Sequence, residues 1–149
     1  GNLTGKEYKE SISIIKNNLT SLKGSPKKVC SSFDCSYNDL ISLKFCPEEI
    51  NGTFDCSENM IETFKYSPKI VTENFNCSHN KLISLKGGPK IVMDGYNCSN
   101  NMLRTLEGCP EEINGVFNCS KNNISSLKHR PKKSSIFNCK NNVFLKPKI

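Results

Sequence analysis

The chain has 149 residues and a formal net charge of +7, from 21 Lys and Arg against 14 Asp and Glu. A chain of this length is normally one domain. No stretch approaches the roughly 18 consecutive apolar residues of a membrane-spanning helix. We also find no charged-then-apolar opening of the kind that marks a signal peptide. We therefore expect no membrane among the partners of these 149 residues.

The first eleven residues differ from the rest. Thr4 and Glu7 stand at capping-box spacing, which predicts a short helix. Such a helix would cover the apolar edge of the repeats that follow, as solenoid proteins require. We therefore expect residues 1–11 to form an N-terminal cap.

From residue 12 onward the sequence repeats every 21 residues. One cysteine marks each full repeat: Cys35, Cys56, Cys77, Cys98, Cys119 and Cys139. Each is preceded by an aromatic residue and followed by an asparagine: Asn38, Asn59, Asn80, Asn101, Asn122 and Asn142. The unit reads F-x-C-S-x-N-x-L-x-x-L-K-x-x-P-x-x-I, and a weaker copy begins at Ile12.

This unit resembles the leucine-rich repeat, whose core is LxxLxLxxN/CxL. The segment FDCSYNDL, residues 33–40, fits that core from its second Leu position. The Pro nine residues after each Asn resembles the short bacterial subtype and small repeat proteins of phages and large DNA viruses. The first Leu position is not kept, and we expect Val29 and its equivalents, one residue earlier, to replace it.

The resemblance implies a repeat solenoid over residues 12–145, with about seven coils and one parallel β-sheet on a concave face. Because F-x-C places the aromatic and the cysteine on one side of a short strand, neighbouring coils bury both. The Pro column predicts turns, 3₁₀ and polyproline-like segments, mostly non-helical, on the convex side. The resemblance also implies a non-catalytic protein that binds another protein, in the cytoplasm or, for a viral protein, in the host cytosol.

At the other end, the last repeat lacks one residue and residues 146–149 are expected to be a tail. Three interpretations stay open there. Phe144, Leu145 and Ile149 fold over the last coil, the chain is truncated, or a partner or another copy covers the end.

The cysteines are interpreted as buried free thiols. Stacked strands place their Cβ atoms about 4.8 Å apart, which is longer than the roughly 3.8 Å that a disulfide prefers. Free thiols in turn suggest a reducing compartment. No CxxC pair occurs, and His79 and His129 lie far apart in register, so we expect no metal and no cofactor. The asparagine column predicts an internal ladder that satisfies backbone groups at the bend after each strand.

No catalytic residues are expected. Asp34 and Asp55 share a column and would lie about 5 Å apart, a spacing known from glycosidases. An open sheet, however, has no cleft to desolvate them, and the serine column has no matching base. We therefore predict that the protein is not an enzyme.

The outward positions of the strands and of the following turn predict the partner-binding surface. The face is acidic at its start and basic by its end. Seven strands make it about 30 Å long, enough for one interface of about 800 Å² per partner. The candidate residues are Asp34, Tyr37, Asp55, Glu58, Asn76, His79, Asn97, Asn100, Asn118 and Lys121.

A lysine stripe supports an alternative, the binding of a polyanion such as nucleic acid or the ribosome. Its residues recur after the last Leu of each repeat and around the densest basic segment: Lys23, Lys44, Lys65, Lys86, Lys128, Arg130, Lys132 and Lys133. Against this alternative, Glu48 and Glu107 interrupt the stripe. The sequence also indicates no aromatic partners beside the lysines for base stacking.

Overall fold

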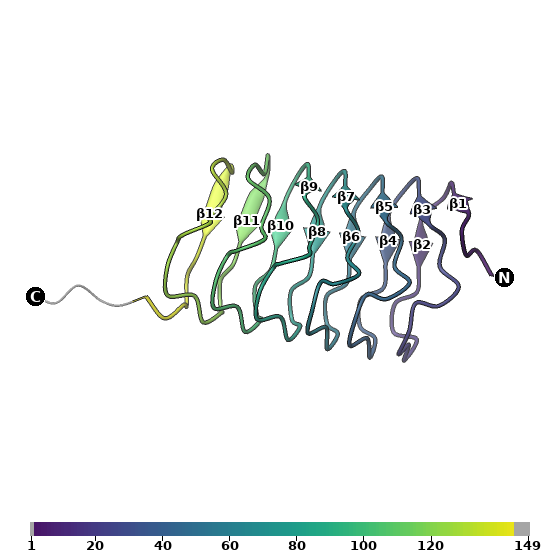
Figure 1. Ribbon diagram of the computed structural model, residues 1–149, viewed down its shortest axis with the longest axis horizontal. Coiled ribbons are helices and arrows are strands. Elements are labelled where there is room, and N and C mark those ends of the chain that lie inside the picture. Colours follow the sequence, from purple (N-terminus) through teal and green to yellow (C-terminus); the bar gives the residue numbers. More distant parts are fainter. Residues whose placement is uncertain (1, 145–149) are drawn as a thin grey trace, which may run out of the picture.

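The computed structural model describes residues 2–144 as one column of stacked coils (Figure 1). Strands of successive coils pair in parallel, with Phe33 opposite Phe54 and Phe54 opposite Phe75. These partners are 21 residues apart, so the predicted repeat solenoid of 21-residue turns is confirmed.

Each central coil contributes two short strands, and these build two parallel sheets rather than the single sheet predicted. Figure 1 shows the two rows of strands running along the column. Sheet A has the order β1 (Glu7–Tyr8), β3 (Lys28–Val29), β5 (Glu49–Ile50), β7 (Ile70–Val71), β9 (Ile91–Val92). Sheet B has the order β12 (Ile136–Asn138), β11 (Val116–Asn118), β10 (Tyr96–Asn97), β8 (Phe75–Asn76), β6 (Phe54–Asp55), β4 (Phe33–Asp34), β2 (Ile12–Ser13).

Sheet A forms because the segment that follows the proline of each repeat also lies beside the equivalent segments of the preceding and following coils. Val29 pairs with Ile50 in register, and both side chains are fully buried. The expected inward position of Val29 and its equivalents Ile50, Val71, Val92 and Ile113 is thereby confirmed. Backbone N–H and C=O groups on this buried row need partners, and the next coil supplies them.

The predicted N-terminal helix is wrong. Glu7 and Tyr8 form β1, which pairs with Lys28 and Val29 of β3. The Thr4 amide donates to Asn2 Oδ1 instead of entering a capping box. A ready-made sheet edge offers these residues backbone partners that an isolated helix of one or two turns lacks. The start of the chain therefore extends sheet A.

The core is a set of ladders along the column axis. Aromatic rings on sheet B stack from coil to coil, with centroid separations between 4.9 Å for Phe75 and Tyr96 and 6.0 Å for Phe33 and Phe54. The cysteines that follow these strands are buried beside them from Cys35 to Cys119, as predicted, whereas Cys139 in the last coil is half-buried. Because each side chain packs against its equivalents above and below, the interior is continuous.

The asparagine ladder is confirmed at the bend after sheet B. Asn80 Nδ2 donates to the carbonyls of Cys56 at 3.0 Å and Cys77 at 3.1 Å, and Asn80 Oδ1 accepts the Ile61 amide at 2.9 Å. One side chain thus joins two coils. Beyond the bend the chain returns through turns, and residues 2–144 contain no helix, hence none that could cross a membrane.

At the C-terminal end, Phe144 is half-buried against the core. Leu145 and Ile149, which were expected to fold over this end, lie outside the described residues.

Candidate binding surfaces

The outward position of each sheet B strand is held by Asp or Asn for a local reason. Asp55 Oδ1 accepts the Ser57 amide at 2.9 Å, and Asn97 Oδ1 accepts the Ser99 amide at 3.1 Å. Short polar side chains that bond the backbone two residues on are typical of such turns. The column is half-buried: Asp34, Asp55, Asn76, Asn97 and Asn118. These predicted site residues therefore shape the turn as well as line the surface.

The next outward position follows that turn and is left-handed in every coil. Its φ lies between 54° and 57° from Tyr37 to Asn141. The side chains of this column differ from coil to coil, although the backbone conformation is the same. Tyr37 is 51% exposed. Its members are Lys16, Tyr37, Glu58, His79, Asn100, Lys121 and Asn141. The sequence placed five of these among the candidate site residues and did not indicate the left-handed backbone.

Charges on this side of the column are segregated along its axis. We define the acidic block as the carboxylates on the outward columns of the second and third coils: Asp34, Asp39, Asp55, Glu58 and Glu62. We define the basic block as the bases on the same columns of the fourth to sixth coils: His79, Lys81, Arg104 and Lys121. These columns carry no base in the first range and no carboxylate in the second.

Two contacts cross the boundary between the blocks. His79 Nδ1 lies 3.6 Å from Glu58 Oε1, and Asn76 Nδ2 donates to Asp55 Oδ2 at 3.2 Å. Both join the third coil to the fourth, so the acidic and basic blocks are continuous on the surface.

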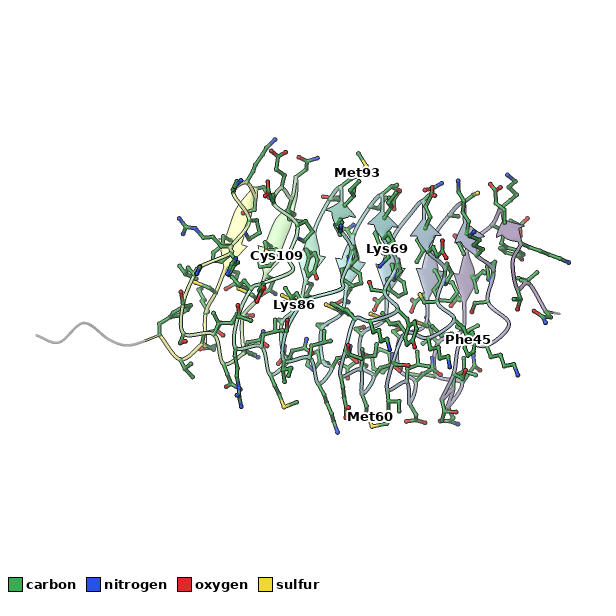
Figure 2. The ribbon with its side chains drawn as sticks, viewed as in Figure 1. Phe45, Met60, Lys69, Lys86, Met93 and Cys109 are labelled. Atoms are coloured by element: carbon green, nitrogen blue, oxygen red, sulfur yellow. The ribbon has the colours of Figure 1, made fainter. Side chains whose placement is uncertain are left out.

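Exposed apolar side chains border the two blocks where the chain turns away from sheet B: Ile41, Met60, Ile83 and Met102. Met60 lies on the lower edge of the column in Figure 2, on the far side from Met93. The repeat places Met60 and Met102 on an outward column, but none of the four was predicted as a site residue, because an apolar residue that recurs only in alternate repeats gives no clear signal in the sequence. Together with the blocks they make a mixed charged and apolar surface.

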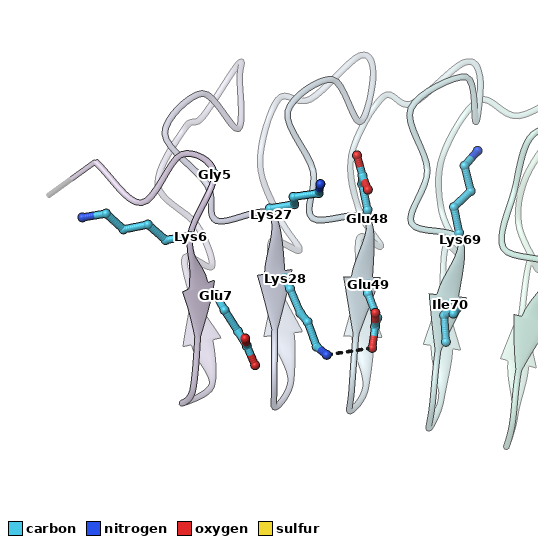
Figure 3. A pocket seen from close by; sticks show the side chains of 9 residues that line it. All are labelled: Gly5, Lys6, Glu7, Lys27, Lys28, Glu48, Glu49, Lys69 and Ile70. Atoms are coloured by element: carbon cyan, nitrogen blue, oxygen red, sulfur yellow. Dashed lines mark ion pairs between the residues drawn. The ribbon is translucent and has the colours of Figure 1, made fainter.

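The outward face of sheet A is organised differently. Lysines and glutamates are interspersed along it, as Figure 3 shows around a cavity of about 410 Å³ that Lys27, Lys28, Glu48 and Glu49 line. Lys28 Nζ lies 3.2 Å from Glu49 Oε1. Hydrogen bonds from the Cys30 thiol and from Lys9, with the charge of Lys9, lower the pKa of Glu7 to about 2. Opposite charges on this face are therefore paired locally.

The lysine stripe has aromatic neighbours, which corrects the sequence interpretation. Lys44 Nζ lies 5.2 Å from the centroid of the Phe45 ring, and Lys65 Nζ lies 5.4 Å from that of Tyr66. The pairs are not evident from the repeat pattern, because only these two repeats have Phe or Tyr after the lysine.

Further along the stripe the charges are partly neutralised. Lys86 Nζ pairs with Glu107 at 3.3 Å, and Lys132 Nζ with Glu111 at 3.2 Å. Lys133 pairs with Glu112 through the backbone only, and Lys128 and Arg130 are exposed. Among residues 2–144 the stripe therefore has two stretches without ion pairs, one at Lys23, Lys44 and Lys65 and one at its basic end around Lys128 and Arg130.

All nine cysteines are free thiols. Burial raises the pKa of Cys56, Cys77 and Cys98 well above the ordinary value, and that of Cys109 to about 12. These thiols therefore stay protonated and unreactive near neutral pH. Within residues 2–144 no three His, Cys, Asp or Glu side chains gather in a way that could hold a metal ion.

Comparison with known proteins adds no relative: no protein-family model, no curated protein and no solved structure matches this chain.

Proposed function

We propose that this protein is a non-catalytic binding module, of a leucine-rich-repeat-like kind, that recognises another protein through the outward side of sheet B. The observation that carries the proposal is the segregation of charge into an acidic and a basic block. A face that serves only for solubility needs no such order, and the interspersed charges of sheet A are an example of one. Segregated charge instead favours a partner with the complementary pattern.

The partner's chemistry follows from the two blocks. It presents basic groups to the second and third coils and acidic groups to the fourth to sixth coils. Apolar groups of the partner pack against Met60, Ile83 and their neighbours, which supply contact area that charges alone do not. Such an interface is oriented, because reversing the partner along the axis places like charges opposite each other.

The left-handed column offers the variable contacts. Since its backbone is held by the Asn ladder and the turn beneath it, a side chain there can change without disturbing the coil. Tyr37 is the one large aromatic residue of this column, and Lys16 Nζ lies 5.2 Å from the centroid of its ring. Tyrosine is enriched at interface centres. The resemblance to viral and bacterial repeat proteins makes an intracellular target the first place to search, which is an analogy of fold.

The test begins with capture of partners from cell extract and identification by mass spectrometry, followed by a direct binding titration. The key variant replaces Tyr37, Glu58 and His79 together by Asn. Asn100 and Asn141 already occupy this left-handed position, so the fold tolerates the substitution. We expect a loss of affinity of at least tenfold with an unchanged melting temperature.

The matched control is Met93→Asn on the opposite edge of the column (Figure 2), where Asn51 and Asn114 hold the equivalent position. It should bind as the unmodified protein does. If the triple variant keeps full affinity while Met93→Asn loses it, the partner binds elsewhere and the proposal fails.

A further inference from the structure

The return turns of five coils contain a left-handed position, which glycine holds in three of them and Phe45 and His129 hold in the other two. Gly24, Gly87 and Gly108 hold it with φ values of 96°, 83° and 96°. A Cβ atom added at Gly108 would clash with the carbonyl group of Leu85 in the preceding coil. Left-handed backbone explains the glycine at all three positions, and lack of space adds to it at Gly87 and Gly108.

Phe45 occupies the same position in the second coil. Its φ is 70°, a region that bulky side chains rarely adopt, and its side chain is 48% exposed. Burial of the ring therefore explains little of why Phe stands at this position, and the left-handed backbone disfavours a side chain of this size. An aromatic residue at a strained, exposed position is a candidate for a binding role.

The surroundings of Phe45 are cationic and aromatic. Tyr66 holds the equivalent position one coil on and is 41% exposed. Lys44 and Lys65 lie over the two rings, and Lys23 is the preceding rung of the same stripe. Phe45 also lines a cavity of about 380 Å³ with Lys23, Lys27 and Glu48. Among residues 2–144 we find no carboxylate paired with Lys23, Lys44 or Lys65.

We propose that this ledge, made of Lys23, Lys44, Phe45, Lys65 and Tyr66, binds single-stranded nucleic acid. Bases stack on Phe45 and Tyr66, and phosphates lie beside the lysines. Stacking on aromatic side chains beside a positively charged track is the general means by which proteins hold single strands without reading their sequence. Successive coils are about 4.8 Å apart, so neighbouring rungs can serve neighbouring nucleotides.

The ledge is separate from the outward side of sheet B, so the inference stands or falls independently of the proposed function. It also differs from a general attraction of a basic protein to polyanions. Phosphate contacts alone hold duplex and single strand alike, whereas stacking needs unpaired bases.

The first measurement is fluorescence anisotropy with labelled 12-nucleotide oligo-U and oligo-dT, and with a duplex of the same length. We expect saturable binding of one or both single strands and weaker binding of the duplex. With three phosphate contacts, raising salt from 50 to 200 mM should lower the affinity roughly 15- to 20-fold. Absence of saturable binding at 50 mM salt, or equal binding of the duplex, overturns the proposal.

The second measurement uses Phe45→Gly, which gives the turn the residue that it has in Gly24, Gly87 and Gly108. We expect the melting temperature to stay or rise while the affinity for the single strand falls about tenfold. Phe45→Leu, which keeps an apolar side chain without the ring, and Tyr66→Ala should show the same loss. The control Met93→Asn, exposed on the upper edge of the column in Figure 2, should bind normally.

A structural role for Phe45 gives the opposite result, a lower melting temperature and unchanged affinity, and would overturn the proposal. The triple Asn variant of Tyr37, Glu58 and His79 should bind oligonucleotide as the unmodified protein does. If it does not, the nucleic acid lies on sheet B and the ledge is not its site.

Discussion

The central coils and the last coil make the same hydrogen bonds but differ in burial. Asn80, with coils on both sides, is 8% exposed, whereas Asn142 in the last described coil is half-buried. Asn142 nevertheless donates to Cys119 and Cys139 and accepts the Ile124 amide, as Asn80 does with its own neighbours. The difference shows that each coil fixes the hydrogen bonds of its own Asn side chain, while the coil that follows it shields that side chain from water. The energetic value of each ladder position should therefore grow toward the middle of the column.

The largest expected effect of this burial is a loss of stability at alkaline pH. Burial raises the pKa of the Cys56, Cys77 and Cys98 thiols in the folded state above the ordinary 9.0. Above pH 9 the unfolded chain therefore loses protons that the folded chain keeps, so stability is full below pH 9 and declines as pH rises. Above pH 9, each such thiol should lower the free energy of unfolding by about 1.4 kcal/mol for every further pH unit.

Guanidinium unfolding at pH 7, 8, 9, 10 and 11 measures this decline. The free energy of unfolding should be constant from pH 7 to 8 and fall steeply above 9. Cys77→Ala should make the decline shallower by about one thiol's share, while the same change at half-buried Cys139 serves as the comparison. A pH-independent free energy up to pH 11 would show that the buried thiols do not resist ionisation.

A smaller effect is expected from breaking the asparagine ladder at two heights. Asn80→Ala leaves the Ile61 amide and the Cys56 and Cys77 carbonyls without partners in a buried site, and should cost about 3 kcal/mol. Asn142→Ala frees equivalent groups that water can reach, and should cost about 1 kcal/mol or less. Urea unfolding of both variants gives the comparison. Equal losses in the free energy of unfolding would mean that the hydrogen bonds themselves, and not their burial, set the contribution of the asparagine ladder to stability.

Much of the fold could be predicted from the sequence because a repeat shows its constraints many times. The cysteine column, the asparagine ladder and the inward position of Val29 and its equivalents are visible as recurring residue types at a fixed period. The second sheet could not be predicted in the same way. Its strands are two residues long, too short to show the alternation that marks a strand. A β-branched residue recurring at Val29, Ile50 and Val71 was the available signal.

The candidate site was predicted less completely. Sequence periodicity separates inward from outward columns, and it therefore located Tyr37, Glu58 and His79 correctly on the surface. It could not show that Asp34 and Asp55 accept backbone amides, since an exposed Asp and a turn-forming Asp look alike in sequence. Nor could it place Phe45 and Tyr66 over the lysine stripe. Those contacts depend on the backbone conformation of a turn, which a residue repeat does not specify.

The smallest effect concerns a single hydroxyl group in the middle of the aromatic ladder. Tyr96 is buried where every other full repeat has Phe, and among residues 2–144 its hydroxyl has no hydrogen-bond partner. Tyr96→Phe removes an unsatisfied polar group without changing the ring, and should stabilise the protein by about 1 kcal/mol. The reverse substitution, Phe to Tyr, should have different effects on stability in a central coil and in the last coil. Phe75→Tyr in a central coil should destabilise it by a similar amount, whereas Phe137→Tyr, half-buried in the last coil, should be nearly neutral because water can reach its hydroxyl. Calorimetric melting of the three variants measures this, and a destabilised Tyr96→Phe would reveal a partner for the hydroxyl that the packing does not show.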